Sequence, residues 1–348
     1  MSIPLEMTAV VFDRPHEFAV RTIPTPRPAP GHVLVRVAAS MICATDRKIL
    51  AGRFAGTAFP HVPGHEFSGE IVALGPGDAG PPIGTRVGVE VHVGCGACDR
   101  CREGLYTLCL CYGKPEAGHA HIGFTIAGGL AQYASVPAAA LHVLPDAVSL
   151  EDGAWTDNLG VALWALERGR LVRGERVAVV GPGAIGLCVA QLARALGARE
   201  VVLVGRGERL ERARAFADRV VEDATPLFGT LDLVVEFAGT ADAARDAIRL
   251  ARRGGRVVLG GATGQGVELS GLDLSTIVRG QLDVLGSVAN PKRVSGRALA
   301  LLGDGTIDVH SLTTHRFPLT CFAEAWATFT ERRDGAIRVM LRPQEHDG

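Results

Sequence analysis

The feature that most constrains the fold is an alternation of short apolar segments with helix-like segments, which begins at Val177. Val177–Val180 and Val201–Val204 have the composition of buried strands, and each precedes a segment with apolar residues at helical spacing. The alternation continues through Leu231–Gly239, Arg256–Gly261 and Leu282–Val288. Strands that alternate with helices form parallel sheets with right-handed crossovers. This part of the chain is therefore predicted to be a doubly wound α/β domain.

A glycine-rich sequence, Gly181-Pro-Gly-Ala-Ile-Gly186, follows the first of these strands. Between a strand and a helix, this pattern is typical of dinucleotide-binding sites. Gly181 would make the tight turn, Gly183 would let the backbone approach a pyrophosphate, and Gly186 would allow close helix–strand packing. Free N–H groups at the start of the helix, near Ala184 and Ile185, would face the phosphates. We expect a nicotinamide dinucleotide here; a glycine-rich turn without a ligand is the alternative.

The second strand ends in Val204-Gly205-Arg206. NAD-binding domains of this fold normally carry an aspartate or glutamate here, which accepts hydrogen bonds from the ribose. Without that carboxylate a 2′-phosphate is not repelled, and Arg206 can pair with it. The sequence therefore favours NADP over NAD, with Gly205 and Arg206 as discriminating residues. In the alternative interpretation, Arg206 faces solvent.

The first 150 residues have a different pattern. Short apolar or alternating segments at Thr8–Phe12, Val33–Ala38, Gly69–Leu74 and Arg86–Val93 are separated by stretches rich in proline and glycine. We expect an antiparallel sheet or partial barrel. The length of 348 residues suits about two domains.

Five of the eight cysteines fall between Cys95 and Cys111. The spacing Cys95-x2-Cys98-x2-Cys101-x7-Cys109 offers four thiolates in one loop, which suits tetrahedral zinc in a closed structural site. An iron–sulfur cluster is the weaker alternative, because ferredoxin motifs place the fourth cysteine sooner and follow it with proline. Disulfides are disfavoured in a reducing compartment. Cys111 leaves open which cysteine is the fourth ligand.

A more dispersed set consists of Cys43, Thr45, Asp46, His65 and Glu66. Cysteine and histidine bind zinc, and a catalytic zinc site needs three protein ligands and one open position. Spacing alone does not identify such a site, since Cys43 taken singly would be a small buried residue and His65 a structural histidine.

Charge and composition exclude several classes of protein. The 36 Lys and Arg against 37 Asp and Glu give no basic excess for nucleic acid or anionic membranes. The first residues, MSIPLEM, lack the features of a secretory signal. The charge-free segment 122–145 contains glycine, proline and histidine and is expected to form strands and turns, not a membrane helix. We expect a cytoplasmic protein with a small-molecule substrate and no nucleic-acid or membrane partner.

The order of the motifs resembles that of a known family. Cys43-Ala-Thr-Asp46, Val62–Glu70, the four-cysteine loop and Gly181–Gly186 follow one another as in the zinc-dependent medium-chain alcohol dehydrogenases. The likeness extends to His315–Leu319 and Ile337–Pro343. The chain is most similar to the sorbitol and threonine dehydrogenase branch.

The resemblance implies a division into two domains. Residues 154–290 would form a Rossmann dinucleotide-binding domain. Residues 1–153 and 291–348 would together form a discontinuous, mainly β, chaperonin-10-like catalytic domain that binds zinc.

The resemblance also implies a catalytic zinc site. Cys43 and His65 would be ligands, and Glu66 would be a carboxylate that can approach or replace a ligand. Asp157 matches the acidic third ligand of the branch. Its alternative role is that of an ordinary carboxylate in the first turn of a helix, favourable to the helix dipole.

Three further residues would complete the catalytic set. Thr45 would pass on the substrate proton, and Asp46 would orient His65. His92, in Glu90-Val-His92, is similar to a substrate-pocket histidine of threonine dehydrogenases. An outward-facing strand histidine is the alternative.

The implied activity is reversible hydride transfer between NAD(P) and a secondary alcohol such as a polyol or amino alcohol. Two zinc ions per chain and a homodimer or homotetramer are implied as well. The alternatives are a simple secondary-alcohol or ketone reductase and a zinc-free quinone or enone reductase of the same fold. A zinc-ribbon protein that binds nucleic acid through Arg100 and Arg102 would have no use for a dinucleotide-binding domain.

Overall fold

The computed structural model describes residues 2–54, 56–77, 80–261 and 266–345, which form two compact units. The first unit comprises the described residues up to Asp157, Asn290–Gly303, and those from Val309 onward. The second comprises Asn158–Ala289 and Asp304–Asp308. Compared with the division expected from sequence, residues 154–157 and Asn290 belong to the first unit, and Asp304–Asp308 belong to the second.

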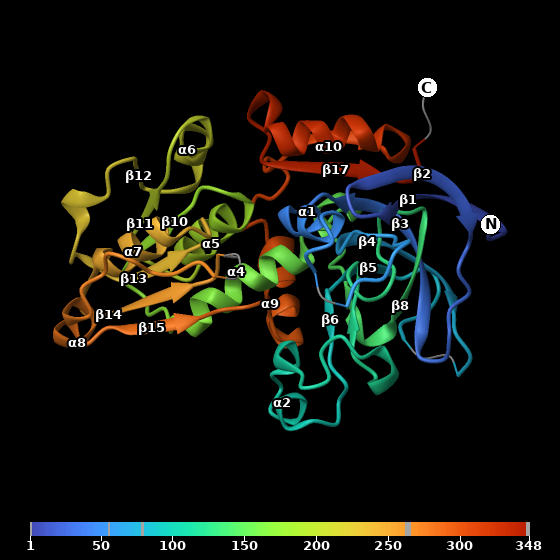
Figure 1. Cartoon of the computed structure of the whole chain (residues 1–348), viewed down its shortest axis with the longest axis horizontal. Coiled ribbons are helices and arrows are strands. Elements are labelled where there is room, and N and C mark those ends of the chain that lie inside the picture. The colour runs from blue at the N-terminus through green and yellow to red at the C-terminus, as the bar shows by residue number, and fades with distance from the viewer. Residues whose placement is uncertain (1, 55, 78–79, 262–265, 346–348) are drawn as a thin grey trace. The chain divides into compact units, whose positions relative to one another are not determined.

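The second unit is built on a six-stranded parallel sheet (Figure 1). Its strand order is β12-β11-β10-β13-β14-β15, the doubly wound order. The strands are β10 (Arg176–Val180), β11 (Glu200–Val204), β12 (Arg219–Val221), β13 (Leu231–Glu236), β14 (Ala251–Leu259) and β15 (Asp283–Gly286). The connecting helices are α5 (Ala184–Ala195), α6 (Glu208–Arg212), α7 (Ala241–Leu250) and α8 (Ser275–Gly280). The predicted doubly wound fold is confirmed.

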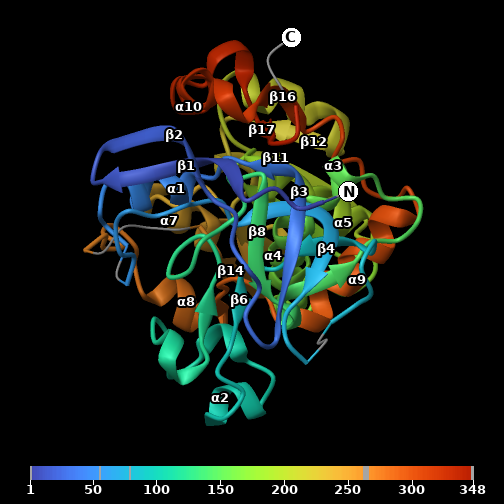
Figure 2. The same ribbon diagram turned by 90° about the vertical axis from the view of Figure 1, so that its right-hand side faces the viewer.

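The sheet of the first unit is mainly antiparallel, as expected. Its order is β16-β17-β3-β4-β5-β9, and β8 also pairs with β3. The strands are β3 (His32–Met41), β4 (Glu66–Leu74), β5 (Arg86–Val89), β8 (Tyr133–Pro137), β9 (Leu141–Val143), β16 (Thr313–Pro318) and β17 (Arg338–Arg342). Figure 2 shows β3 between β4 and β8, in agreement with their pairing.

Smaller elements complete the first unit. They are the hairpin β1 (Glu6–Arg14) and β2 (Glu17–Pro24), the pair β6 (His92–Val93) and β7 (Ala120–His121), and the helices α1 (Ala44–Leu50), α2 (Asp99–Arg102), α3 (Leu150–Gly153), α9 (Lys292–Gly303) and α10 (Phe322–Glu331). Helix α4 (Thr156–Arg168) begins in the first unit and continues into the second. The expected strand Arg86–Val93 is divided, because β5 pairs with β4 and β9 whereas β6 pairs with β7.

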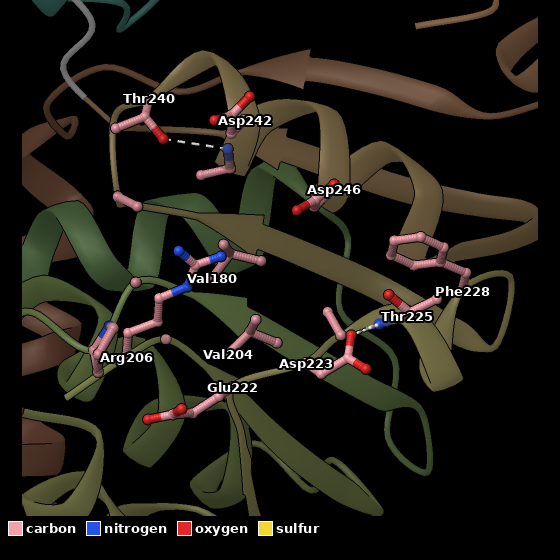
Figure 3. Close-up of a pocket in the computed structure, with 16 residues that line it drawn as sticks. Val180, Val204, Arg206, Glu222, Asp223, Thr225, Phe228, Thr240, Asp242 and Asp246 are labelled. Atoms are coloured by element: carbon pink, nitrogen blue, oxygen red, sulfur yellow. Dashed lines mark hydrogen bonds between the residues drawn. The ribbon is translucent and has the colours of Figure 1, made fainter. Parts of the chain in front are cut away.

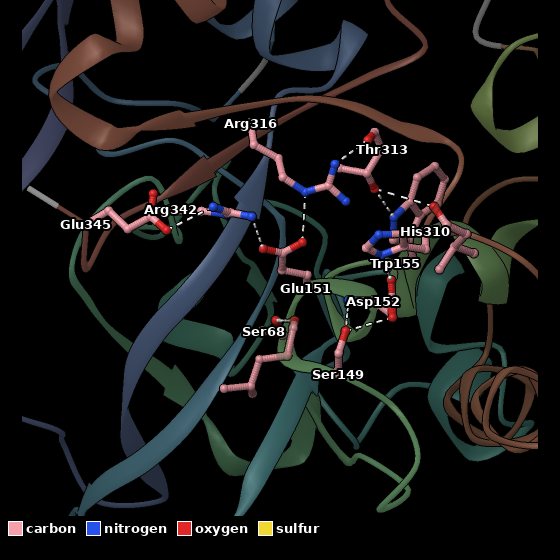
Figure 4. A network of polar contacts seen from close by, with 12 residues as sticks. Ser68, Ser149, Glu151, Asp152, Trp155, His310, Thr313, Arg316, Arg342 and Glu345 are labelled. Carbon is pink, nitrogen blue, oxygen red and sulfur yellow. Dashed lines mark hydrogen bonds and ion pairs between the residues drawn. The ribbon is translucent and has the colours of Figure 1, made fainter. Parts of the chain in front are cut away.

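The C-terminal segment shares the core of the first unit. Phe322 of α10 and Leu341 of β17 are fully buried in one cluster with Phe12 of β1. A polar network joins the same segment to α3 (Figure 4). Glu151 accepts a hydrogen bond from Arg316 Nε at 2.9 Å and pairs with Arg342 at 2.6 Å. Residues far apart in sequence therefore stabilise one folded unit.

None of the described helices is both long enough and apolar enough to cross a bilayer.

Candidate active site and cofactor site

The site in the first unit begins at the start of α1. Cys43 directly precedes this helix, and its backbone N–H donates a hydrogen bond to Asp46 Oδ2 at 2.8 Å. This contact fixes the fully buried Asp46 carboxylate in the first turn. The Thr45 hydroxyl lies 3.8 Å from Cys43 Sγ. The local sequence thus places a thiol, a hydroxyl and a carboxylate at one helix start.

The start of β4 brings His65 and Glu66 to the same place. His65 Nδ1 lies 3.4 Å from Asp46 Oδ1, and His65 Nε2 lies 3.7 Å from Glu66 Oε1. One potential ligand atom from each of Cys43, His65 and Glu66 lies within 4.8 Å of the others. Asp46 is therefore placed to orient the imidazole, with Nε2 directed away from it.

The charges around His65 suit a cation. Burial lowers the pKa of His65, but the negative charges of Cys43 and Asp46 raise it more, so the pKa lies well above its ordinary value. A place that stabilises a buried positive charge with sulfur, nitrogen and carboxylate donors fits a zinc ion.

Glu66 has a second partner that was missed in the sequence. Arg338 of β17, buried like Glu66, donates to Glu66 Oε1 at 2.9 Å and to the carbonyl oxygen of Ile42 at 3.1 Å. Its guanidinium also lies over the Trp155 ring, 5.6 Å from the centroid. The sequence held one indication of this contact. Segment 337–341 is apolar apart from Arg338, and a charged side chain buried in a strand needs a partner.

Asp157 lies in the first turn of α4. Its Oδ1 accepts weak hydrogen bonds from the Val91 backbone N–H at 3.5 Å and from Asn290 Nδ2 at 3.4 Å. Burial raises the pKa of Asp157 to about 7; His65 opposes this rise, while Glu66 and Glu90 add to it. The charges of His65, Glu66 and Glu90 therefore affect the pKa of Asp157. Asp157 is nevertheless not part of the cluster in which the ligand atoms of Cys43, His65 and Glu66 lie within 4.8 Å of one another.

His92 is buried in a group of aromatic rings that extends from His65. The His92 and His121 rings, opposite one another on β6 and β7, stack at 4.0 Å between centroids. The His121 ring stacks on Phe124 at 3.7 Å, and Phe124 lies 4.8 Å from the His65 ring. An outward-facing position for His92 is therefore wrong.

The imidazoles of His92, His119 and His121 favour the neutral form, unlike that of His65. Burial lowers the pKa of His92 to about 3, with the charges of His119 and His65 adding to the effect. Burial also lowers the pKa of His119 and of His121. No motif indicated His119 and His121. The alternation His119-Ala-His121 would have predicted two histidines on the same face of an extended segment.

The four-cysteine loop forms a second cluster. Cys95 Sγ lies 4.0 Å from Cys101 Sγ, and Cys98 Sγ lies 3.9 Å from Cys109 Sγ. All four sulfur atoms lie within 4.8 Å of one another. Hydrogen bonds from the backbone of Ala97 and Cys98 lower the pKa of Cys95 to about 6, which favours the thiolate. Four converging sulfurs, with a thiolate favoured among them, fit a structural zinc ion.

Cys111 has a different role in this loop. Its backbone N–H donates to Cys109 Sγ at 3.4 Å, and it is not part of the group of four. The geometry thus selects Cys109 over Cys111 as the fourth sulfur.

The second unit carries a pocket of about 460 Å³ at the carboxyl ends of β10 and β11 (Figure 3). Gly181 (φ +107°) makes the turn before α5, and a Cβ on Gly186 would lie 2.1 Å from the Gly181 carbonyl oxygen. A Cβ on Gly183 would meet no atom within 4 Å. The loop therefore packs tightly on the helix side and leaves its backbone open at Gly183, which fits a dinucleotide.

Gly205, the position expected to select the cofactor, is sterically restricted. A Cβ on Gly205 would lie 2.4 Å from Pro182 Cδ, so a side chain there requires Pro182 to move. Arg206 lines the pocket and extends toward Val180 in Figure 3. Within the described part of the chain, no carboxylate forms an ion pair with it. Glu222, Asp223, Asp242 and Asp246 also line the pocket.

A doubly wound dinucleotide-binding unit, combined in one chain with a thiol–imidazole–carboxylate cluster and a four-thiol loop, defines a zinc-dependent dehydrogenase. Residues 29–146 match the alcohol dehydrogenase GroES-like domain, and residues 184–303 match the zinc-binding dehydrogenase domain. The chain belongs to the zinc-dependent medium-chain alcohol dehydrogenase family, as its motifs predicted.

Individual relatives agree with this assignment. A Mycobacterium tuberculosis protein named as a probable alcohol dehydrogenase is 33% identical, covering 99% of this chain and 100% of its own length. A sorbitol dehydrogenase of Halalkalibacterium halodurans is 30% identical, and the match covers 94% of this chain and 96% of that protein. A Sinorhizobium meliloti protein assigned to the zinc-binding dehydrogenases, solved with NADP, has a TM-score of 0.89 at 30% identity, covering 97% and 99%.

Proposed function

We propose that this protein oxidises a polyol or a similar hydroxyl-rich secondary alcohol to the ketone, reversibly and with NADP preferred over NAD. The observation that carries the proposal is the convergence of Cys43 and His65 beside Asp46, in a place that stabilises positive charge. Cys43, His65 and Asp157 would hold the catalytic zinc, with Glu66 kept beside them by Arg338. When bound, zinc supplies Lewis-acid activation of the substrate hydroxyl, and NADP supplies the hydride acceptor.

Two residues beside the ligands would move the substrate proton and orient His65. Thr45, next to Cys43 Sγ, would accept a hydrogen bond from the substrate hydroxyl and pass on its proton, releasing its own hydroxyl proton in exchange. Asp46 would hold the His65 ring through Nδ1, so that Nε2 faces the metal. Asp46 is itself held in the first turn of α1 by the Cys43 backbone N–H at 2.8 Å, which limits its freedom.

The aromatic group around His92 supports a hydroxyl-rich substrate. His92 Nδ1 and His119 Nε2 are buried and form no hydrogen bond with any described residue. Neutral imidazoles can donate to or accept from hydroxyl groups, whereas they offer no charge to a carboxylate or phosphate. The names of relatives agree: they include sorbitol dehydrogenases and a D-arabinitol dehydrogenase.

A homo-oligomer is also expected, because exposed apolar side chains lie near strand β15 at the edge of the second unit's sheet. A cytoplasmic location is supported by the free state of all eight cysteines, which suits a reducing compartment.

The test compares Asp157→Ala with Glu324→Ala, an exposed carboxylate on α10, over a panel of polyols, amino alcohols and simple secondary alcohols. We expect Asp157→Ala to lower kcat on the order of 10³-fold, because an anionic ligand is lost, while the Kd for NADPH stays unchanged. Glu324→Ala should match the wild type. Full activity of a preparation shown to be free of zinc would favour a zinc-free reductase and contradict the proposal.

A further inference from the structure

Asp157 is held by an asparagine that is distant in sequence. Asn290 directly precedes the Pro291 that leads into α9, and it is 1% exposed. Its Nδ2 lies 3.4 Å from Asp157 Oδ1 and 3.4 Å from the Asp157 carbonyl oxygen. One amide group therefore contacts both the side chain and the backbone of the residue, which restrains the rotation of the carboxylate.

A third residue fixes the asparagine in turn. Ser295, fully buried on α9, donates from Oγ to Asn290 Oδ1 at 2.7 Å. The Asp157 carbonyl oxygen accepts hydrogen bonds and cannot donate them, so the amide nitrogen of Asn290 must face Asp157 and its oxygen must face Ser295. The direction of the whole chain of contacts, from Ser295 to Asn290 to Asp157, is thus determined by donor and acceptor chemistry.

The contacts select one carboxylate oxygen. Val91 and Asn290 both approach Oδ1, and within the described residues no hydrogen bond reaches Oδ2. A neutral amide also restrains the carboxylate without compensating its negative charge, whereas a lysine or arginine in its place would compete with a cation. Oδ2 is therefore the oxygen left available for a metal ion.

We propose that Asn290, fixed by Ser295, is a positioning residue that presents Asp157 Oδ2 to the catalytic metal and thereby sets the affinity and geometry of the site. This inference rests on the proposed function, in which Asp157 is a ligand. The proposal adds Asn290, which precedes α9, and Ser295, which lies on α9, to the metal site. No sequence motif indicated either residue.

The test measures the metal directly. The catalytic zinc is exchanged for Co²⁺, and the Kd for Co²⁺ is determined by chelator competition together with the visible absorption spectrum. We expect Asn290→Ala to weaken Co²⁺ binding about 10- to 100-fold and to change the spectrum. Ser295→Ala should cause a smaller change in the same direction, and Ser295→Thr, which keeps the hydroxyl, should restore binding.

Two parallel variants make the outcome decisive. Gln132→Ala also removes a side-chain amide contact in the first unit, the half-buried one to the Thr8 N–H, and it should leave the Co²⁺ spectrum unchanged. Should Asn290→Ala not fold, Ser295→Ala and its threonine rescue carry the test. If Asp157→Ala abolishes binding but Asn290→Ala and Ser295→Ala bind Co²⁺ as the wild type does, this inference alone is overturned. If Asp157→Ala binds normally, Asp157 is no ligand, and both this inference and the proposed ligand set fail.

Discussion

Gly205 stands where NAD-binding domains of this fold normally carry a ribose-binding carboxylate. The neighbouring Pro182 limits the room for any side chain at this position. The Pro182 ring occupies the space that a Cβ at position 205 would need. A ribose-binding carboxylate at position 205 would therefore require the Pro182 ring to move. The adjacent Arg206 guanidinium, which has no ion-pair partner within the described chain, is left as the charged group nearest to that position in sequence.

We predict that Arg206→Ala lowers kcat/KM for NADPH about 10- to 100-fold, since a charge-assisted contact to the 2′-phosphate is lost. The value for NADH should change less than about 3-fold, because NADH lacks that phosphate. The control is Arg214→Ala, an arginine paired with Glu211 outside this pocket. A wild-type enzyme that uses NADH better than NADPH would contradict the prediction.

Sequence motifs identified residues that act within a few positions of one another. Cys43 and Asp46 belong to one helix start, and the four cysteines belong to one loop, so their spacing carries the geometry. The partners of these residues could not be predicted in the same way. Arg338 is 272 positions from Glu66, and Asn290 is 133 positions from Asp157. Only the folding of the C-terminal segment back onto the first unit brings such pairs together.

At the scale of elements, the four-cysteine loop is attached to the sheet through one buried glutamate. Tyr106 of the loop donates its hydroxyl hydrogen bond to Glu90, which lies between β5 and β6. The other Glu90 oxygen lies 2.7 Å from His142 Nε2 on β9. The same residue raises the pKa of Asp157 through its charge. A disordered loop would therefore leave a buried carboxylate next to the active site without one of its partners.

We predict that Cys109→Ser removes one zinc ion per chain and lowers the Tm, because a structural zinc site contributes to folding. The second zinc ion should remain. The matched control is Cys111→Ser, which should keep both zinc ions, since the Cys111 sulfur lies outside the group of four converging sulfurs. Metal analysis after dialysis, with thermal unfolding, measures both effects. Loss of zinc from Cys111→Ser and not from Cys109→Ser would reverse the assignment of the fourth ligand.

The element pattern was predictable where apolar runs are long enough to show a period. The five strands expected in the second unit are present: β10, β11 and β13 are almost wholly buried, whereas β15 is largely exposed. Strand β12 was not expected: it has three residues, is partly exposed and lies at the edge of the sheet. The expected strand 86–93 was broken, because a change of pairing partner leaves no local signature.

At the scale of the whole molecule, the β15 edge of the second unit's sheet is where we expect a second copy of the chain to bind. Strand β15 pairs on one side with β14 and ends the sheet. Apolar side chains near this edge are exposed to solvent: Leu274 by 70%, Val278 by 73% and Val288 by 58%. An unprotected edge strand beside exposed apolar residues is a common site of pairing between chains. A two-fold axis at β15 would join two sheets and close the assembly at a dimer.

We predict that the wild-type protein elutes at twice or four times the mass of one chain in size-exclusion chromatography with light scattering. Val278→Asp should shift the mass toward the monomer at micromolar concentration, because burying an unpaired carboxylate in an interface is unfavourable. The control is Ile83→Asp, an exposed isoleucine of the first unit, which should keep the wild-type mass. A wild type that is monomeric at about 10 μM, a concentration at which typical homo-oligomers stay assembled, would remove the basis for an interface at β15. Equal dissociation of both variants would show that added charge, and not its position at this edge, disrupts the assembly.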